Sequence, residues 1–245
     1  RLCAAATDAD AAAAVAAAVS DTRARLESLA GPGAPPRLVA VSKTKPLELL
    51  MAAYEAGQRD FGENYAQELL DKAPHMPPDC RWRYVGNLQS NKAKGLVHGV
   101  PNLDCVETVD RLKIARALDA AVASSDRADR PLSVLLQVNT SGEVSKSGVA
   151  PGEVAALASA VAVECPNLDV RGVMTIGMPR PGLGPDDLDP DFEALKLARA
   201  AVASALGRAE ASLELSMGMS ADWERAVRQG STSVRVGSAI FGARG

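Results

Sequence analysis

The sequence predicts an α/β protein, a closed (β/α)8 TIM barrel preceded by one additional helix. The 245 residues suffice for one large domain, and 47% of them are hydrophobic, which supports a substantial core. Short apolar segments alternate with helical segments, which is typical of a parallel sheet. Eight such units in a chain of this length favour closure into a barrel. We therefore predict a single domain over residues 1–245.

The predicted elements follow one another from the amino terminus. The first helix covers about Asp8–Leu29, because an Ala-rich stretch continues into the mixed pattern of Asp21–Glu27. After a linker of Gly and Pro at 31–36, the strands are Arg37–Lys43, Asp60–Asn64, Arg81–Gly86, Cys105–Thr108, Ser133–Asn139, Leu168–Ile176, Ser212–Met217 and Ser233–Val236. The helices between them are Pro46–Ala56, Tyr65–Ala73, Asn91–Val97, Asp110–Ala123, Pro151–Val163, Phe192–Leu206 and Asp222–Gln229.

Helix ends are marked by particular residues. Pro46 and Pro151 stand where helices begin, and Gly57 and Gly207 stand where helices end. After Val236 the chain is too short for a full eighth helix, so we expect the first helix to pack against the last and first strands. An open, doubly wound sheet is the alternative fold.

The charge and the cysteines limit the classes of function. A net charge of −3 gives no general attraction to nucleic acid or to an anionic membrane, and we expect neither as a partner. No apolar run is long enough to span a membrane. The cysteines, Cys3, Cys80, Cys105 and Cys165, are widely spaced and are expected to be free thiols in a reducing compartment. We predict a cytoplasmic protein. The first residue is Arg1 and not Met, so the alternative is that a targeting peptide has been removed and that the protein is located in an organelle.

Lys43 is the first candidate for the functional site. It follows the apolar run Leu38–Val41, at the carboxyl end of the first strand, where ligands bind in parallel α/β folds. Alternation along the strand places Lys43 on the same face as Val39 and Val41. Partial burial lowers the pKa of a lysine amine and makes it a nucleophile toward carbonyls. The alternative is a surface lysine at a strand end, which we expect of Lys45.

Small residues at the ends of the last two strands form a candidate phosphate site. Ser216 belongs to the seventh strand, and Gly237 and Ser238 follow the eighth. Glycine lets backbone N–H groups approach an anion, and hydroxyl groups add donors. A lysine beside a phosphate site suits pyridoxal 5′-phosphate, and it also suits a phosphosugar aldolase. The alternative is that these turns are only tight connections.

Arg235 lies two residues before Gly237 and is expected on the inner face of the barrel. Pyridoxal phosphate enzymes pair the ring nitrogen with either Asp or Arg. The alternative is an arginine paired with a core carboxylate such as Glu107 or Glu214. His75 and His98 have no metal-ligating neighbour at a useful spacing, and we predict no metal site.

Several motifs give the chain a specific resemblance. They are AVSKTKP, FGENYAQEL, GNLQSNK, VNTSGEVSKSG, VMTIG and LSMGMSADWERAVRQGSTSVRVGSAIFG, in order from Ala40 to Gly242. Together they resemble the pyridoxal phosphate homeostasis protein family, whose fold is similar to the N-terminal domain of alanine racemase. The resemblance implies Lys43 as the Schiff-base lysine and Asn64 near the cofactor. It also implies Ser216, Gly237 and Ser238 at the phosphate, and Arg235 at the ring nitrogen.

The resemblance implies a carrier or buffer of pyridoxal 5′-phosphate, a vitamin B6 cofactor, without established catalysis. Apo forms of pyridoxal phosphate enzymes are the expected partners, and a monomer or weak dimer the expected state. Asn87 departs from the family pattern, in which we expect His, and Lys146 is a candidate for a secondary cofactor site. The alternatives are an amino-acid racemase and an interaction module without a cofactor. Against the racemase, the protein beyond Phe241 offers no second domain to supply an opposing tyrosine.

Overall fold

The computed structural model describes residues 2–30, 33–127, 130–143 and 146–243. Its strands form one closed barrel of parallel strands in the order β1 to β8, with β8 beside β1. The predicted barrel is confirmed, and the alternative of an open sheet is wrong. The strands are β1 Arg37–Val41, β2 Asp60–Glu63, β3 Arg81–Tyr84, β4 Leu103–Val109, β5 Leu132–Gln137, β6 Leu168–Met174, β7 Glu214–Met219 and β8 Ser233–Val236.

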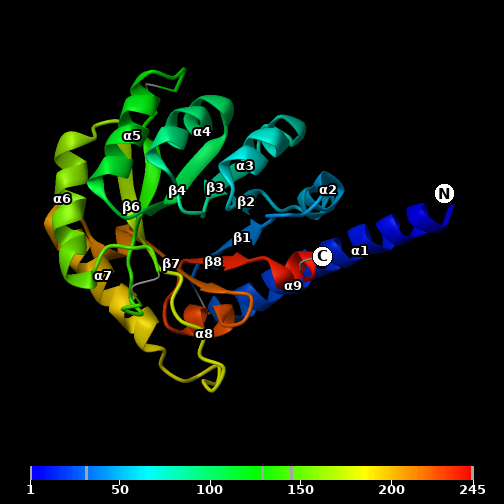
Figure 1. The fold of residues 1–245 in the computed structure, drawn as a ribbon. Coiled ribbons are helices and arrows are strands. Elements are labelled where there is room, and N and C mark those ends of the chain that lie inside the picture. The colour runs from blue at the N-terminus through cyan, green and yellow to red at the C-terminus, as the bar shows by residue number, and fades with distance from the viewer. Residues whose placement is uncertain (1, 31–32, 128–129, 144–145, 244–245) are drawn as a thin grey trace.

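The helices surround the barrel (Figure 1). They are α1 Leu2–Ala30, α2 Leu47–Glu55, α3 Ala66–Lys72, α4 Ala93–Gly99, α5 Leu112–Ala123, α6 Val154–Glu164, α7 Pro190–Leu206, α8 Trp223–Arg228 and α9 Ser238–Phe241. Short 3-10 turns cover Ala73–His75, Ser90–Lys92, Pro151–Glu153 and Glu210–Ser212. The sheet therefore has one face toward the helices and one toward the barrel axis, as parallel sheets require.

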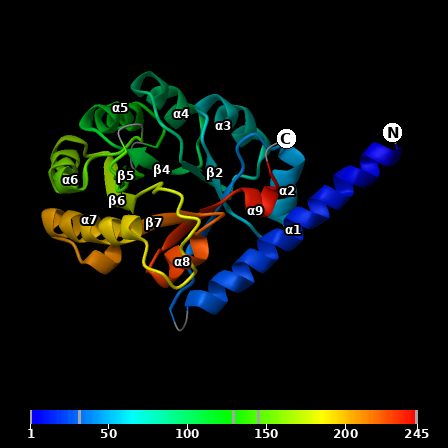
Figure 2. The ribbon, with the colours of Figure 1, turned by 60° about the horizontal axis from the view of Figure 1, so that its bottom comes forward.

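The long helix α1 packs against α2, α8 and α9, and its amino-terminal end extends beyond the barrel (Figure 2). Arg25 donates two hydrogen bonds to Glu224 on α8, at 3.1 and 2.7 Å. Arg23 donates to the carbonyl of Gly57, just after α2, at 2.6 Å. The first helix therefore lies beside the first and last units of the barrel, but its main contacts are with their helices and not with the first and last strands as predicted.

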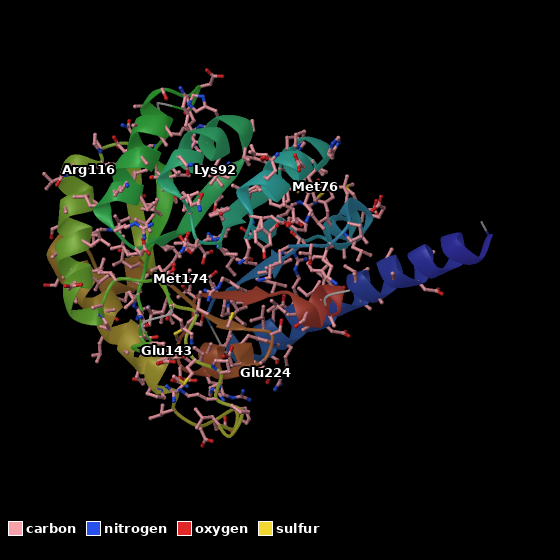
Figure 3. All side chains as sticks on the ribbon, viewed as in Figure 1. Met76, Lys92, Arg116, Glu143, Met174 and Glu224 are labelled. Atoms are coloured by element: carbon pink, nitrogen blue, oxygen red, sulfur yellow. The ribbon has the colours of Figure 1, made fainter. Side chains whose placement is uncertain are left out.

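Aliphatic side chains fill the space between strands and helices, whereas the barrel interior is mixed. Met174 lies inside the barrel and Arg116 on its outer surface (Figure 3). Cys105, Leu135 and Met174 form a small apolar cluster. Arg83 and Glu107 are also fully buried, which requires that they be paired.

Several predicted boundaries differ from the structure by one to three residues. The first strand ends at Val41 and not at Lys43, because the backbone turns at Thr44, whose φ is +59°. The seventh strand continues to Met219 and not to Met217. Within the part of the chain that the structure describes, Cys80, Cys105 and Cys165 are free and buried, and no helix is long and apolar enough to cross a membrane. The Cys3 side chain lies outside the described residues.

A candidate ligand site at the carboxyl ends of the strands

A cavity of about 380 Å³ opens at the carboxyl end of the barrel. Its volume falls within the range of roughly 300–1,000 Å³ that is usual for small-molecule sites. The residues that line it come from the ends of six strands and from the carboxyl-terminal segment: Val41, Lys43, Lys45, Asn64, Val85, Ile176, Met219, Ser220, Ala221, Arg235, Gly237, Ser238 and Gly242. Five of the six predicted site residues are among them.

Two lysines of the turn after β1 line this cavity. Lys43 is half-buried and lies beside Val41, on the cavity side that alternation predicts. Lys45 is also half-buried, and its Nζ donates to the carbonyl of Ala243 at 2.6 Å. Lys45, which we expected to be a surface lysine, thus keeps part of its surface exposed and also lines the cavity.

Arg235 is buried on β8 and is held by two acceptors. Its Nη1 donates to Ser216 Oγ at 2.5 Å, and its Nη2 donates to the carbonyl of Thr175 at 2.6 Å. A guanidinium group has five N–H donors, so Arg235 keeps donors for the cavity that it lines. Burial lowers the pKa of Arg235 from its ordinary value, although the charge of Glu107 opposes this shift.

Glu107 lies behind Arg235 in the barrel interior. Its Oε2 is 3.8 Å from Arg235 Nη1 and accepts a hydrogen bond from Ser216 at 2.6 Å, while its Oε1 accepts from Arg83 Nε at 2.6 Å. Burial alone would raise the pKa of Glu107, but the two arginines and Ser216 outweigh it and lower that pKa. The carboxylate is therefore ionised and keeps a charged arginine at the cavity.

Of the two carboxylates that the sequence suggests as partners of Arg235, Glu107 is within ion-pair distance. Glu214 pairs instead with Arg83 at 2.7 Å. Arg235 is thus paired with a core carboxylate and also lines the cavity, so the ion pair does not remove it from the candidate site.

The turn after β8 places backbone amides at the cavity wall. Ser220 Oγ accepts from the amides of Gly237 at 3.1 Å and Ala239 at 3.4 Å. Within the described part of the chain, the hydroxyl proton of Ser220 has no acceptor, so it can be donated to an anion. Ser216 and Ser220 flank the turn after the seventh strand in the sequence, and Ser220, which the predicted phosphate contacts did not include, is the one that lines the cavity.

Asn64 follows β2, the strand next to β1, and also lines the cavity. Its Oδ1 is buried and has no hydrogen-bond partner within the described residues. A buried polar atom without a partner costs about 1–3 kcal/mol. A ligand that donates a hydrogen bond here would satisfy it.

Three residues that the sequence analysis named do not line the cavity. Ser216 is fully buried below it, with its hydroxyl shared between Arg235 and Glu107. Lys146 donates to the carbonyl of Gly177 at 2.8 Å and pairs with Glu143. Asn87 is exposed and donates to Ser147 Oγ at 2.9 Å.

The amino-acid sequence is similar to one protein family over most of its length. A model of the alanine racemase N-terminal domain matches residues 16–245. The pyridoxal phosphate homeostasis protein of Bos taurus is 46% identical over 220 residues, which are 87% of this chain and 79% of that protein. The protein of the same name from Caenorhabditis elegans is 47% identical over 211 residues, covering 85% of this chain and 86% of that one.

Solved structures share the fold. PipY of Synechococcus elongatus, solved with pyridoxal phosphate bound, is 32% identical with a TM-score of 0.68, and the match covers 89% of this chain and 98% of PipY. Alanine racemase of Corynebacterium glutamicum is 19% identical with a TM-score of 0.63, and the match covers 95% of this chain and 62% of the racemase. At that identity the second likeness shows a common fold alone.

Proposed function

The chain belongs to the pyridoxal phosphate homeostasis protein family, and on this premise we propose that it binds pyridoxal 5′-phosphate and buffers or delivers it. One observation carries the proposal: a single cavity brings together Lys43, Arg235 and the turn of Gly237 and Ser238. These residues supply an amine, a cationic donor and backbone amides, which match the aldehyde, the ring nitrogen and the phosphate of this cofactor.

Pyridoxal phosphate would supply an aldehyde carbon, to which a neutral lysine amine would add with loss of one water molecule. We assign this amine to Lys43, which emerges from the end of β1 into the cavity. Asn64 follows β2, the strand beside β1, and its Oδ1, which has no partner among the described residues, would accept a hydrogen bond from the ligand close to Lys43.

The phosphate is assigned to the turn after β8. Gly237 and Ser238 line the cavity there, and Ser220 adds a hydroxyl whose proton has no acceptor in the described structure. We therefore replace Ser216 by Ser220 as the phosphate contact, because Ser216 lies below the cavity. Ser216 instead orients Arg235 for the ring nitrogen.

We also propose that the protein does not racemise or transaminate amino acids at an enzymatic rate. Racemisation requires a second acid–base group on the opposite face of the substrate. Among the described residues, no tyrosine lines the cavity: Tyr54 bonds Asp79, Tyr84 is buried, and Tyr65 points to solvent with 57% of its surface exposed. Against transamination, an arginine at the ring nitrogen leaves that nitrogen without a proton, which weakens the cofactor as an electron sink.

Borohydride reduction of the cofactor-loaded protein, followed by peptide mapping, tests the assignment of the amine. We expect the reduced adduct on Lys43 and its loss in Lys43→Ala, whereas Lys45→Ala serves as the control that retains it. An adduct on Lys45 or Lys146 with Lys43 unmodified would contradict the assignment.

Deuterium exchange at Cα of alanine tests the absence of catalysis. We expect exchange far slower than about 1 per second, the lower end of ordinary enzyme turnover. Exchange at or above that rate, lost in Lys43→Ala, would favour the racemase alternative. Lys45, which also lines the cavity, would then be the first candidate for the second acid–base group.

A further inference from the structure

The turn that carries Lys43 has a backbone conformation that its sequence disfavours. Thr44 has a φ of +59°, in the left-handed region that β-branched residues rarely adopt. The amide of Lys45 donates to the carbonyl of Ser42 at 3.1 Å and closes the turn around Lys43. Such a conformation costs about 1–3 kcal/mol and persists only where the surroundings stabilise it.

Two side chains of α3 bond this backbone on both sides of Lys43. Glu68 Oε1 accepts from the amide of Thr44 at 2.5 Å. Lys72 Nζ donates to the carbonyl of Ser42 at 2.8 Å and to Glu68 at 2.6 Å. The Glu68–Lys72 pair therefore links the two backbone groups that flank Lys43.

A buried carboxylate of β2 fixes the position of Lys72. Glu63 Oε1 accepts from Lys72 at 2.8 Å and from the hydroxyl of Ser42 at 2.7 Å. An ammonium group has three donors, and those of Lys72 go to Ser42, Glu63 and Glu68. All three donors of Lys72 thus form hydrogen bonds that stabilise the turn. Only 11% of the Lys72 side chain is exposed, so salt screens these interactions weakly.

We propose that the Glu68–Lys72 pair is a positioning device for Lys43. Because the pair fixes the turn before a ligand binds, no conformational entropy has to be lost in ordering this segment when the amine reacts. Neither side chain lines the cavity, so both act through the backbone and not by touching the ligand. This inference rests on the proposed function, in which Lys43 is the reacting amine.

The test compares two ligands on Lys72→Met in the full chain. Pyridoxal 5′-phosphate reacts with the amine, whereas pyridoxine 5′-phosphate has the same ring and phosphate but an alcohol in place of the aldehyde. We expect the Kd for the aldehyde to rise about tenfold or more, because an amine displaced by about 1 Å reacts poorly. The Kd for the alcohol should stay unchanged. Lys72→Arg, which keeps the charge and the donors, should recover most of the affinity.

Lys196→Met is the matched control. It breaks an ion pair between Lys196 and Glu193 at 3.0 Å on α7, where both side chains are more than a third exposed. Neither Kd should change in this variant, since an exposed pair of this kind contributes little.

Amide hydrogen exchange of the cofactor-free protein gives a second measurement. We expect faster exchange at Thr44 in Lys72→Met and Glu68→Ala, with unchanged exchange in the strands of the barrel. Equal weakening of both ligands would assign Lys72 a general structural role and overturn the proposal, as would unchanged affinities and exchange. If the wild-type protein binds the aldehyde but shows no adduct on Lys43, the proposed function is wrong. Hydrogen exchange is measured on the cofactor-free protein, so it still tests whether the Glu68–Lys72 pair holds the turn.

Discussion

Replacing Glu107 by Gln removes one charge from the barrel interior and leaves the shape of the side chain. Arg83 would keep Glu214 at 2.7 Å and Asp104 at 3.3 Å, but Arg235 would lose the carboxylate at 3.8 Å, and Ser216 would lose a charged acceptor. Breaking a buried ion pair on one side costs about 3–5 kcal/mol. We expect this loss in the free energy of unfolding at neutral pH, measured by urea denaturation of the cofactor-free protein.

The effect of this substitution should depend on pH in a definite direction. The folded protein lowers the pKa of Glu107 below its ordinary value of 4.5. A carboxyl group with a lowered folded pKa contributes stability above its unfolded pKa and loses that contribution as the pH falls through the folded pKa. The difference in unfolding free energy between wild type and Glu107→Gln should therefore be full above about pH 5 and shrink on acidification.

Glu214→Gln is the control for this experiment. Glu214 contacts the same Arg83, but a quarter of its side chain is exposed, so its loss should cost about 1 kcal/mol or less. Equal losses for the two variants, or a difference that stays constant on acidification, would refute the assignment of Glu107 as the buried counter-ion of Arg83 and Arg235.

Two glycine substitutions test the cavity wall. A Cβ at Gly86 would lie 1.8 Å from the carbonyl oxygen of Asn64, so Gly86→Ala should displace Asn64 and weaken cofactor binding about tenfold or more in an absorbance titration. The control is Gly95→Ala on α4, whose Cβ would meet nothing within 4 Å beyond the neighbouring backbone of its own helix and should leave binding intact. A Cβ at Gly237 would lie 3.1 Å from the carbonyl of Val41, so Gly237→Val should press on the end of β1 and block the approach of phosphate. Full affinity in Gly237→Val would show that the phosphate binds elsewhere.

The fold could be predicted because each strand–helix unit carries its own local signals. Buried parallel strands are short apolar runs, and Pro46 and Gly207 mark helix ends in the sequence. The predicted ends of the strands were less accurate, because the end of a strand depends on where the backbone turns. The left-handed backbone conformation of Thr44 accompanies the end of β1 before Lys43, and a threonine in the sequence does not predict such a conformation.

The same difficulty explains Ser216 and Ser220. We predicted that the seventh strand ends at Met217, which would place Ser216 near the rim of the cavity. The strand continues to Met219, so Ser216 lies inside the barrel and Ser220 comes to the rim. Sequence spacing identified a serine-rich turn, but which hydroxyl faces the cavity depends on the register of β7 against β8, and that register shifts between Ser216 and Met219.

Arg83 carried no signal at all. It belongs to the segment Arg81–Gly86, which we predicted as a strand without assigning a role to Arg83, yet Arg83 is 1% exposed and joins Glu107 to Glu214. A pair of buried opposite charges contributed by strands far apart in the chain can be identified only after the barrel is closed.

The contact of α1 with α8 and α9 has a consequence for synthesis on the ribosome. Arg25 and Glu224 are 199 positions apart, so α1 emerges early and cannot complete its packing until the last units follow. Until β8 arrives, the free side of β1 is an open sheet edge that can pair with another chain. Such long-range closure slows folding and lengthens the time during which nascent chains can aggregate. Substitutions near the carboxyl terminus that delay closure should therefore reduce the yield of folded protein more than their effect on equilibrium stability implies.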